Sequence, residues 1–144
     1  MSSIKRVYLI IAIIIPIIIF FITYSDLDDL SDVDTTNILE QIEFYAIYDS
    51  EEDIVEITFI DKSNNTKSAI LEVLGMDETY HKEYVFNNES SFAAKLYLEY
   101  VPKYGWETTP VTLEIQHSQF GIIGLKTEIV ELGKDPAKII VERK

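Results

Sequence analysis

Alternating apolar and polar residues recur through most of the chain, and this period of two constrains the fold more than any other feature. Val55, Ile57 and Phe59 share one face of a predicted strand, and Glu56 and Thr58 take the other. Similar alternation marks positions 67–74, 79–86, 92–100, 111–116, 123–129 and 137–142. Turn-forming Asn, Asp, Gly, Pro and Ser residues separate these segments. Strands at such short, regular spacing predict an antiparallel β-sandwich.

Residues 36–48 carry two overlapping patterns. Ile38, Leu39 and Ile42 suit the apolar face of a helix, whereas Ile42 and Phe44 suit a strand. Asn37 and Glu40 have the spacing of a capping box, so we expect a short helical turn at 37–41 and then a first strand. The fold class expected for residues 37–144 is an all-β antiparallel sandwich, immunoglobulin-like with seven or eight strands. A β-barrel is the alternative.

An uncharged run of eighteen residues, nine of them Ile, occupies positions 7–24. As a helix it would be about 27 Å long, close to the hydrocarbon thickness of a bilayer of about 30 Å. We therefore expect a single N-terminal transmembrane helix, kept as a signal anchor. The alternative is a cleaved secretory signal, but the apolar run is long for one, and Thr23 and Ser25 match a cleavage site poorly.

Charge around this run predicts its orientation. Lys5 and Arg6 precede it, and acidic residues follow it, so the positive-inside rule predicts a cytoplasmic stub at 1–6. Residues 25–36 then form an acidic juxtamembrane stalk, and 37–144 form an extracytoplasmic domain. The expected location is the cell membrane, with the lipid bilayer as one partner.

The overall charge restricts the classes of partner and cofactor. The chain has 12 Lys and Arg against 25 Asp and Glu, a formal charge of −13, which argues against nucleic acid as a partner. The absence of cysteine excludes disulfides, iron–sulfur clusters and thiolate chemistry. We expect no cofactor.

Residues for catalysis or metal binding are few. His81 and His117 are the two histidines, and no third histidine or cysteine supports a metal site between them. We interpret one as an exposed strand residue and the other as a cap on the end of the sandwich. The chain also lacks a Gly-x-Ser-x-Gly nucleophile elbow. We therefore predict no metal, no catalytic residue and no enzymatic activity.

Aromatic residues between positions 97 and 106 are the most distinctive local feature. Tyr97, Tyr104 and Trp106 are candidates for an exposed aromatic patch, because Tyr and Trp bury large areas at binding surfaces. The alternative is that Trp106 closes the open end of the sandwich. Asn64 and Asn88 each begin an N-glycosylation acceptor pattern in a predicted turn.

These features favour an accessory or interaction subunit: a non-catalytic, single-pass membrane protein whose external domain binds a larger membrane or envelope complex. An alternative is a free surface-binding or adhesion module that recognises glycan or an envelope protein through the region 97–106. A lesser alternative is a pilin-like or stator-like appendage component, since a basic stub, an apolar helix and a β head resemble the layout of pilins and of archaeal stator and envelope proteins. The Gly or Ala expected at a pilin processing site is absent before Val7.

Overall fold

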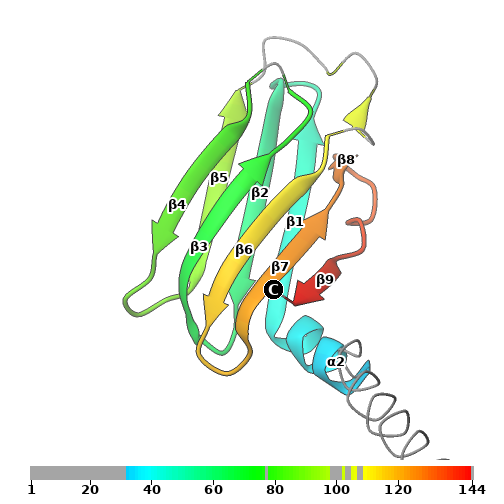
Figure 1. Ribbon diagram of the computed structural model, residues 1–144. Coiled ribbons are helices and arrows are strands. Elements are labelled where there is room, and N and C mark those ends of the chain that lie inside the picture. Colours follow the sequence, from blue (N-terminus) through cyan, green and yellow to red (C-terminus); the bar gives the residue numbers. More distant parts are fainter. Residues whose placement is uncertain (1–31, 77, 98–101, 103–104, 107–108, 144) are drawn as a thin grey trace, which may run out of the picture. The chain divides into compact units, whose positions relative to one another are not determined.

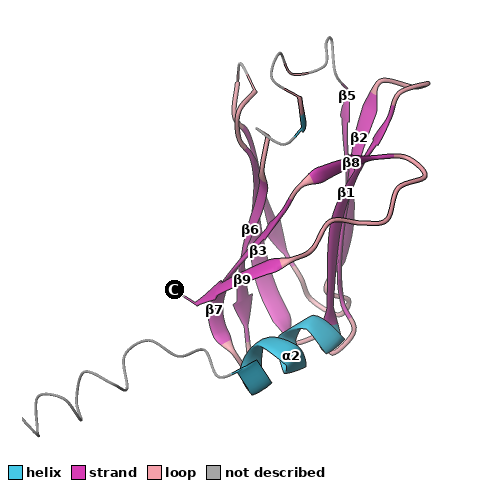
Figure 2. Ribbon diagram, turned by 90° about the vertical axis from the view of Figure 1, so that its right-hand side faces the viewer, coloured by secondary structure: helices cyan, strands magenta, loops and turns pink. Residues whose placement is uncertain are grey.

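The computed structural model describes residues 32–76, 78–97, 102, 105–106 and 109–143 of the chain. These residues form two β-sheets that face one another, with one short helix at one end (Figure 1, Figure 2). The described part of the chain is therefore mostly β, with a β-sandwich-like fold.

Four strands make one sheet and five make the other. In spatial order, the four-stranded sheet comprises β5 (Ser91–Tyr97), β2 (Ile54–Asp61), β1 (Ile42–Asp49) and β8 (Ile129–Glu131). The five-stranded sheet comprises β4 (Tyr80–Val85), β3 (Thr66–Val73), β6 (Val111–His117), β7 (Gly121–Thr127) and β9 (Ile140–Arg143). Helix α2 (Asp32–Gln41) precedes β1.

The chain crosses between the sheets several times. β1 and β2 form a hairpin in one sheet, and β3 and β4 form one in the other. β5 then returns to pair with β2, while β6 pairs with β3, both antiparallel. β8 is the exception to the antiparallel pattern, since it lies parallel to β1 and pairs Ala46 with Ile129. This exchange of strands between two facing layers is typical of Greek-key sandwiches.

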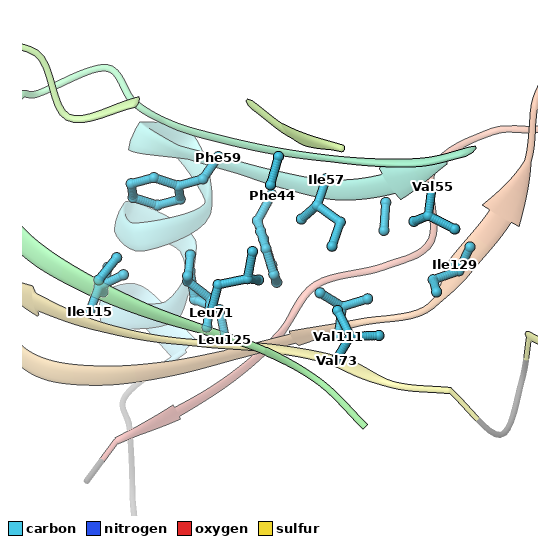
Figure 3. Close-up of a cluster of buried hydrophobic side chains, with 14 of the residues drawn as sticks. Phe44, Val55, Ile57, Phe59, Leu71, Val73, Val111, Ile115, Leu125 and Ile129 are labelled. Atoms are coloured by element: carbon cyan, nitrogen blue, oxygen red, sulfur yellow. The ribbon is translucent and has the colours of Figure 1, made fainter. Parts of the chain in front are cut away.

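The hydrophobic core fills the space between the sheets (Figure 3). Inward residues of β1 and β2, including Phe44, Ile57 and Phe59, face Leu71 and Leu125 of the other sheet. All five are almost completely buried. The period-two pattern in the sequence therefore identified the buried faces, because successive side chains on a strand point to opposite sides.

Helix α2 packs against one end of the sandwich (Figure 2). Ile38 is buried in the core, while Leu39 on the next position is exposed. At the helix end, the Gln41 carbonyl accepts a hydrogen bond of 2.8 Å from the backbone N–H of Lys62. The expected helical turn at 37–41 is thus part of a longer helix of 10 residues.

The expected fold class is wrong in two respects. First, the described residues hold nine strands rather than seven or eight, because the segment 123–129 belongs to two strands: β7 ends at Thr127, and β8 begins at Ile129 and joins the opposite sheet. Second, within the described ranges no helix has the length and apolar character needed to cross a membrane, α2 being short and rich in acidic residues.

The segment 7–24, expected as the transmembrane helix, lies outside the described residues together with Lys5 and Arg6. The single-pass membrane character expected of the chain is not supported, because what is shown is a β-sandwich-like fold with one short helix.

The packing of Phe59 provides a test of this core. Its ring is fully buried, with centroids 6.0 Å from Phe86 and 5.6 Å from Phe92. We expect Phe59→Ala to lower the free energy of unfolding by about 3 to 5 kcal/mol, measured by urea denaturation, because it removes apolar contacts and leaves a cavity. Val85→Ala, at a residue 79% exposed, should change it by less than about 0.5 kcal/mol. Equal losses would contradict the assigned core.

Candidate functional site

A buried carboxylate, Asp61, stands at the end of β2 and organises the turn that follows. Its Oδ1 accepts hydrogen bonds from the backbone N–H and the hydroxyl of Ser63, at 2.8 and 2.6 Å. Its Oδ2 accepts from the N–H of Asn65 at 2.9 Å, and from the N–H and hydroxyl of Thr66, both at 2.8 Å. Five donors thus replace the water that this buried charge has lost.

His117, at the end of β6, joins the same cluster. Its Nε2 lies 3.4 Å from Asp61 Oδ2 and 3.3 Å from Ser63 Oγ. Its Nδ1 accepts hydrogen bonds from the backbone N–H groups of Gln119 and Phe120, at 3.2 and 3.3 Å, and the Phe120 ring stacks on the imidazole. Because Nδ1 faces two donors, the neutral tautomer with the proton on Nε2 fits this site.

The pKa values of Asp61 and His117 are both lowered, for different reasons. Burial alone would raise the pKa of Asp61, but the hydrogen bonds from Ser63 and Thr66 outweigh it and lower that pKa. Burial lowers the pKa of His117, and the nearby Asp61 charge opposes this shift without cancelling it. The folded site therefore holds an ionised carboxylate beside a neutral imidazole near neutral pH.

Ser63, His117 and Asp61 are the residue types of a nucleophilic triad, but their arrangement differs from one. In a triad the carboxylate accepts from His Nδ1–H, while Nε2 faces the nucleophile. Here the carboxylate binds the Ser63 hydroxyl directly, and Nδ1 is occupied by the backbone of the β6–β7 turn. This geometry joins the turn after β2 to the turn after β6. It does not leave the His117 imidazole free to act as a base for the Ser63 hydroxyl.

Sequence reasoning assigned His117 as a cap on the sandwich end but missed Asp61. The available signal was an Asp at the end of a strand followed by Ser63 two residues later, a pattern in which an Asp side chain binds the turn backbone. Tertiary contact with His117, 56 residues away in sequence, could not be seen in that local pattern.

The candidate aromatic residues do not form one patch within the described part of the chain. Tyr97 is 77% exposed at the end of β5. Trp106 is half-buried and packs on the core, with its ring centroid 4.6 Å from that of Tyr48. Tyr104 lies outside the described residues. Of the two described candidates, Tyr97 is thus the exposed one.

The two acceptor patterns for glycosylation have their hydroxyl residues inside the fold. Asn64 and Asn88 are exposed, but Thr66 and Ser90 are buried. Thr66 donates to Asp61, and the Ser90 hydroxyl donates to the Thr66 carbonyl at 2.7 Å. The Asn64 side-chain carbonyl also accepts from the Ser90 N–H at 3.1 Å. These contacts give both hydroxyls a structural role in the folded domain.

A second feature is a surface pocket of about 220 Å³ on the outer face of the four-stranded sheet, the face that points away from the core. Its apolar lining consists of Tyr45, Ile47, Ile54 and Leu132. The Leu132 N–H donates to the Tyr48 carbonyl at 2.8 Å, which holds the segment after β8 beside β1. We call Tyr45, Ile47, Ile54, Leu132 and Tyr97 the outer patch, because Tyr97 is the cross-strand neighbour of Ile54.

Charged residues complete the lining of the pocket: Asp49, Glu52, Glu56 and Lys95. Lys95 Nζ lies 3.4 Å from Glu56 Oε2, so this pair is locally neutral. Asp49 accepts a hydrogen bond from the Glu51 N–H at 2.9 Å, but neither Asp49 nor Glu52 takes part in an ion pair among the described residues. The pocket therefore combines an apolar wall with acidic side chains, of which Asp49 and Glu52 have no ion-pair partner among the described residues.

The other histidine, His81, lies on the outer face of the five-stranded sheet. Its Nδ1 is 3.0 Å from Glu72, and its Nε2 is 3.7 Å from Glu83. The hydrogen bond that His81 donates to Glu72 raises the His81 pKa, with a further contribution from Glu83. The described ranges contain no group of three or more His, Cys, Asp or Glu residues arranged to hold a metal ion.

Comparison of the chain with protein-family models, with curated proteins and with solved structures finds no match.

The Asp61 cluster predicts a large cost for removing its charge. Asp61→Asn should lower the free energy of unfolding by about 3 kcal/mol, because the new amide group would direct its N–H donors either at those of Ser63 or at those of Asn65 and Thr66. Urea denaturation measures the loss, with Glu142→Gln on exposed β9 as the control. A loss below about 1 kcal/mol would show that the cluster contributes little.

The lowered pKa of His117 predicts that protonation of this residue at acidic pH destabilises the folded protein. The unfolded chain takes up this proton near the ordinary histidine pKa of about 6.5, and the folded protein takes it up only at lower pH. The His117 contribution to stability should therefore be lost as pH decreases from about 6.5, and the Asp61 contribution only in more acidic solution, below about pH 4. His117→Gln should reduce the fall between pH 7 and pH 5 in urea titrations, and an unchanged pH dependence would contradict this assignment.

Proposed function

We propose that this chain is a non-catalytic interaction module, an accessory subunit whose β-sandwich binds a protein partner through the outer patch. The observation that carries the proposal is a sheet face that the described residues leave partly exposed, with large apolar and aromatic side chains around a pocket. Tyr97 is 77% exposed and Leu132 63% exposed, so burial of both by a partner would remove considerable apolar surface from water.

The layout of the patch supports a protein partner. Its residues come from β1, β2, β5 and the segment after β8, so a hydrogen-bonded sheet holds most of them at fixed spacing. Tyrosine beside isoleucine and leucine, with charged residues around them, is the composition of a binding hot spot with a polar rim. The core stays on the opposite face of the same strands, so binding does not require the domain to open.

The test is affinity capture of the tagged full-length protein from the cells that naturally produce it. A double variant, Tyr97→Ala with Leu132→Ala, should lose a partner that wild type captures at fixed ratio, with affinity reduced about tenfold or more. The residues are exposed, so thermal stability should change little.

The matched control is Val85→Ala, which removes a residue of similar exposure from the outer face of the other sheet. It should capture the partner as wild type does. Capture that survives the double variant, or that fails equally with Val85→Ala, would overturn the outer patch as the binding surface.

A further inference from the structure

We infer that the pocket in the outer patch receives a lysine or arginine side chain from a basic segment of a partner protein. This inference rests on the proposed function and names the chemistry of its partner. Three observations carry it: the mixed lining of the pocket, an acidic hairpin beside it that forms no ion pair within the described part of the chain, and a tyrosine among the lining residues.

The lining of the pocket matches a long side chain with an apolar stem and a cationic head. Ile47 and Ile54 lie on neighbouring strands, and Leu132 completes the apolar wall. Ile54 is only 8% exposed, so the inner part of the wall is already shielded from water. Lysine and arginine pack their methylene groups on such surfaces and keep their charge at the polar edge.

The charge at that edge is negative and largely uncompensated. The β1–β2 hairpin places Asp49, Glu51, Glu52 and Asp53 within five consecutive residues. No described basic side chain forms an ion pair with any of them, whereas Glu56 is paired with Lys95. Asp53 instead accepts a hydrogen bond of 3.0 Å from the Tyr48 hydroxyl. A positively charged partner would complement this edge, and an acidic partner would be repelled.

Tyr45 adds a third attraction. Tyr45 is one of the residues that line the pocket, and a tyrosine ring can attract a lysine or arginine cation placed over its face. A bare metal ion would use the carboxylates but would gain nothing from Ile47 or Leu132. The apolar wall therefore favours an organic cation on a partner chain over a free ion.

The test uses the full-length protein labelled at isoleucine δ1 methyl groups and observed by NMR. The probe is a capped pentapeptide with two lysines, and the matched peptide has two glutamines instead. The lysine peptide should shift the signals of Ile47 and Ile54 saturably and leave Ile122, exposed on β7, unshifted. The shifts should weaken as salt is raised, because surface charges are screened.

Two variants, each of which removes one negative charge, distinguish binding in the pocket from attraction to the overall negative charge of the protein. Glu52→Gln should weaken peptide binding by about three- to tenfold, whereas Glu142→Gln on β9 should leave it unchanged. Equal effects of both variants, equal shifts with the glutamine peptide, or shifts produced by calcium ions alone at the same concentration would overturn the inference.

The outcomes also distinguish this inference from the proposed function. If the Tyr97 and Leu132 double variant loses its partner but the lysine peptide leaves Ile47 and Ile54 unshifted, the outer patch binds a partner of different chemistry and the inference fails alone. If the peptide binds but the double variant still captures the partner as wild type does, the proposed function fails while the pocket retains its affinity for cations.

Discussion

The buried Asp61 carboxylate is the interaction on which this end of the fold depends. Its backbone N–H donates to the Ser90 carbonyl at 2.9 Å, and its side chain binds the turn to β3 and faces His117 at the end of β6. It therefore connects the four-stranded sheet to the five-stranded sheet at the end of the sandwich, beyond the hydrophobic core. An ionised carboxylate persists there because every lone-pair direction has a donor, which offsets the cost of removing the charge from water.

The Asp61 cluster and the outer patch, the proposed binding surface, lie at opposite ends of the β1–β2 hairpin. Asp61 lies at one end of β2, near helix α2, and the acidic hairpin and the pocket lie at the other. Along these strands every second residue enters the core, and the residues between them form the outer face. A partner bound to that face would contact strands whose other side is fixed by packing, so the binding surface is preorganised at little additional entropic cost.

The strands were predictable because burial on one face imposes a period of two, as Val55, Ile57 and Phe59 illustrate. The number of strands was not predictable. Ile129 continues the apolar register of β7 in sequence, but it pairs in parallel with Ala46 in the other sheet. The exposure of Tyr97 agrees with its residue type and register, while its role in binding stays a prediction. Asp61 and the pocket were missed, since Asp49, Glu56 and Leu132 are neighbours only after three separate segments meet.

The sequence by itself determined the β character of the domain, the residues that face its core and the acidity of the hairpin, because these follow from local periodicity and charge. Only the tertiary structure decided which sheet each strand joins, that His117 remains neutral beside Asp61, and that the Trp106 ring packs on Tyr48. Those outcomes depend on contacts between residues far apart in the chain, where burial and the satisfaction of hydrogen bonds are properties of the assembled layers and not of any one segment.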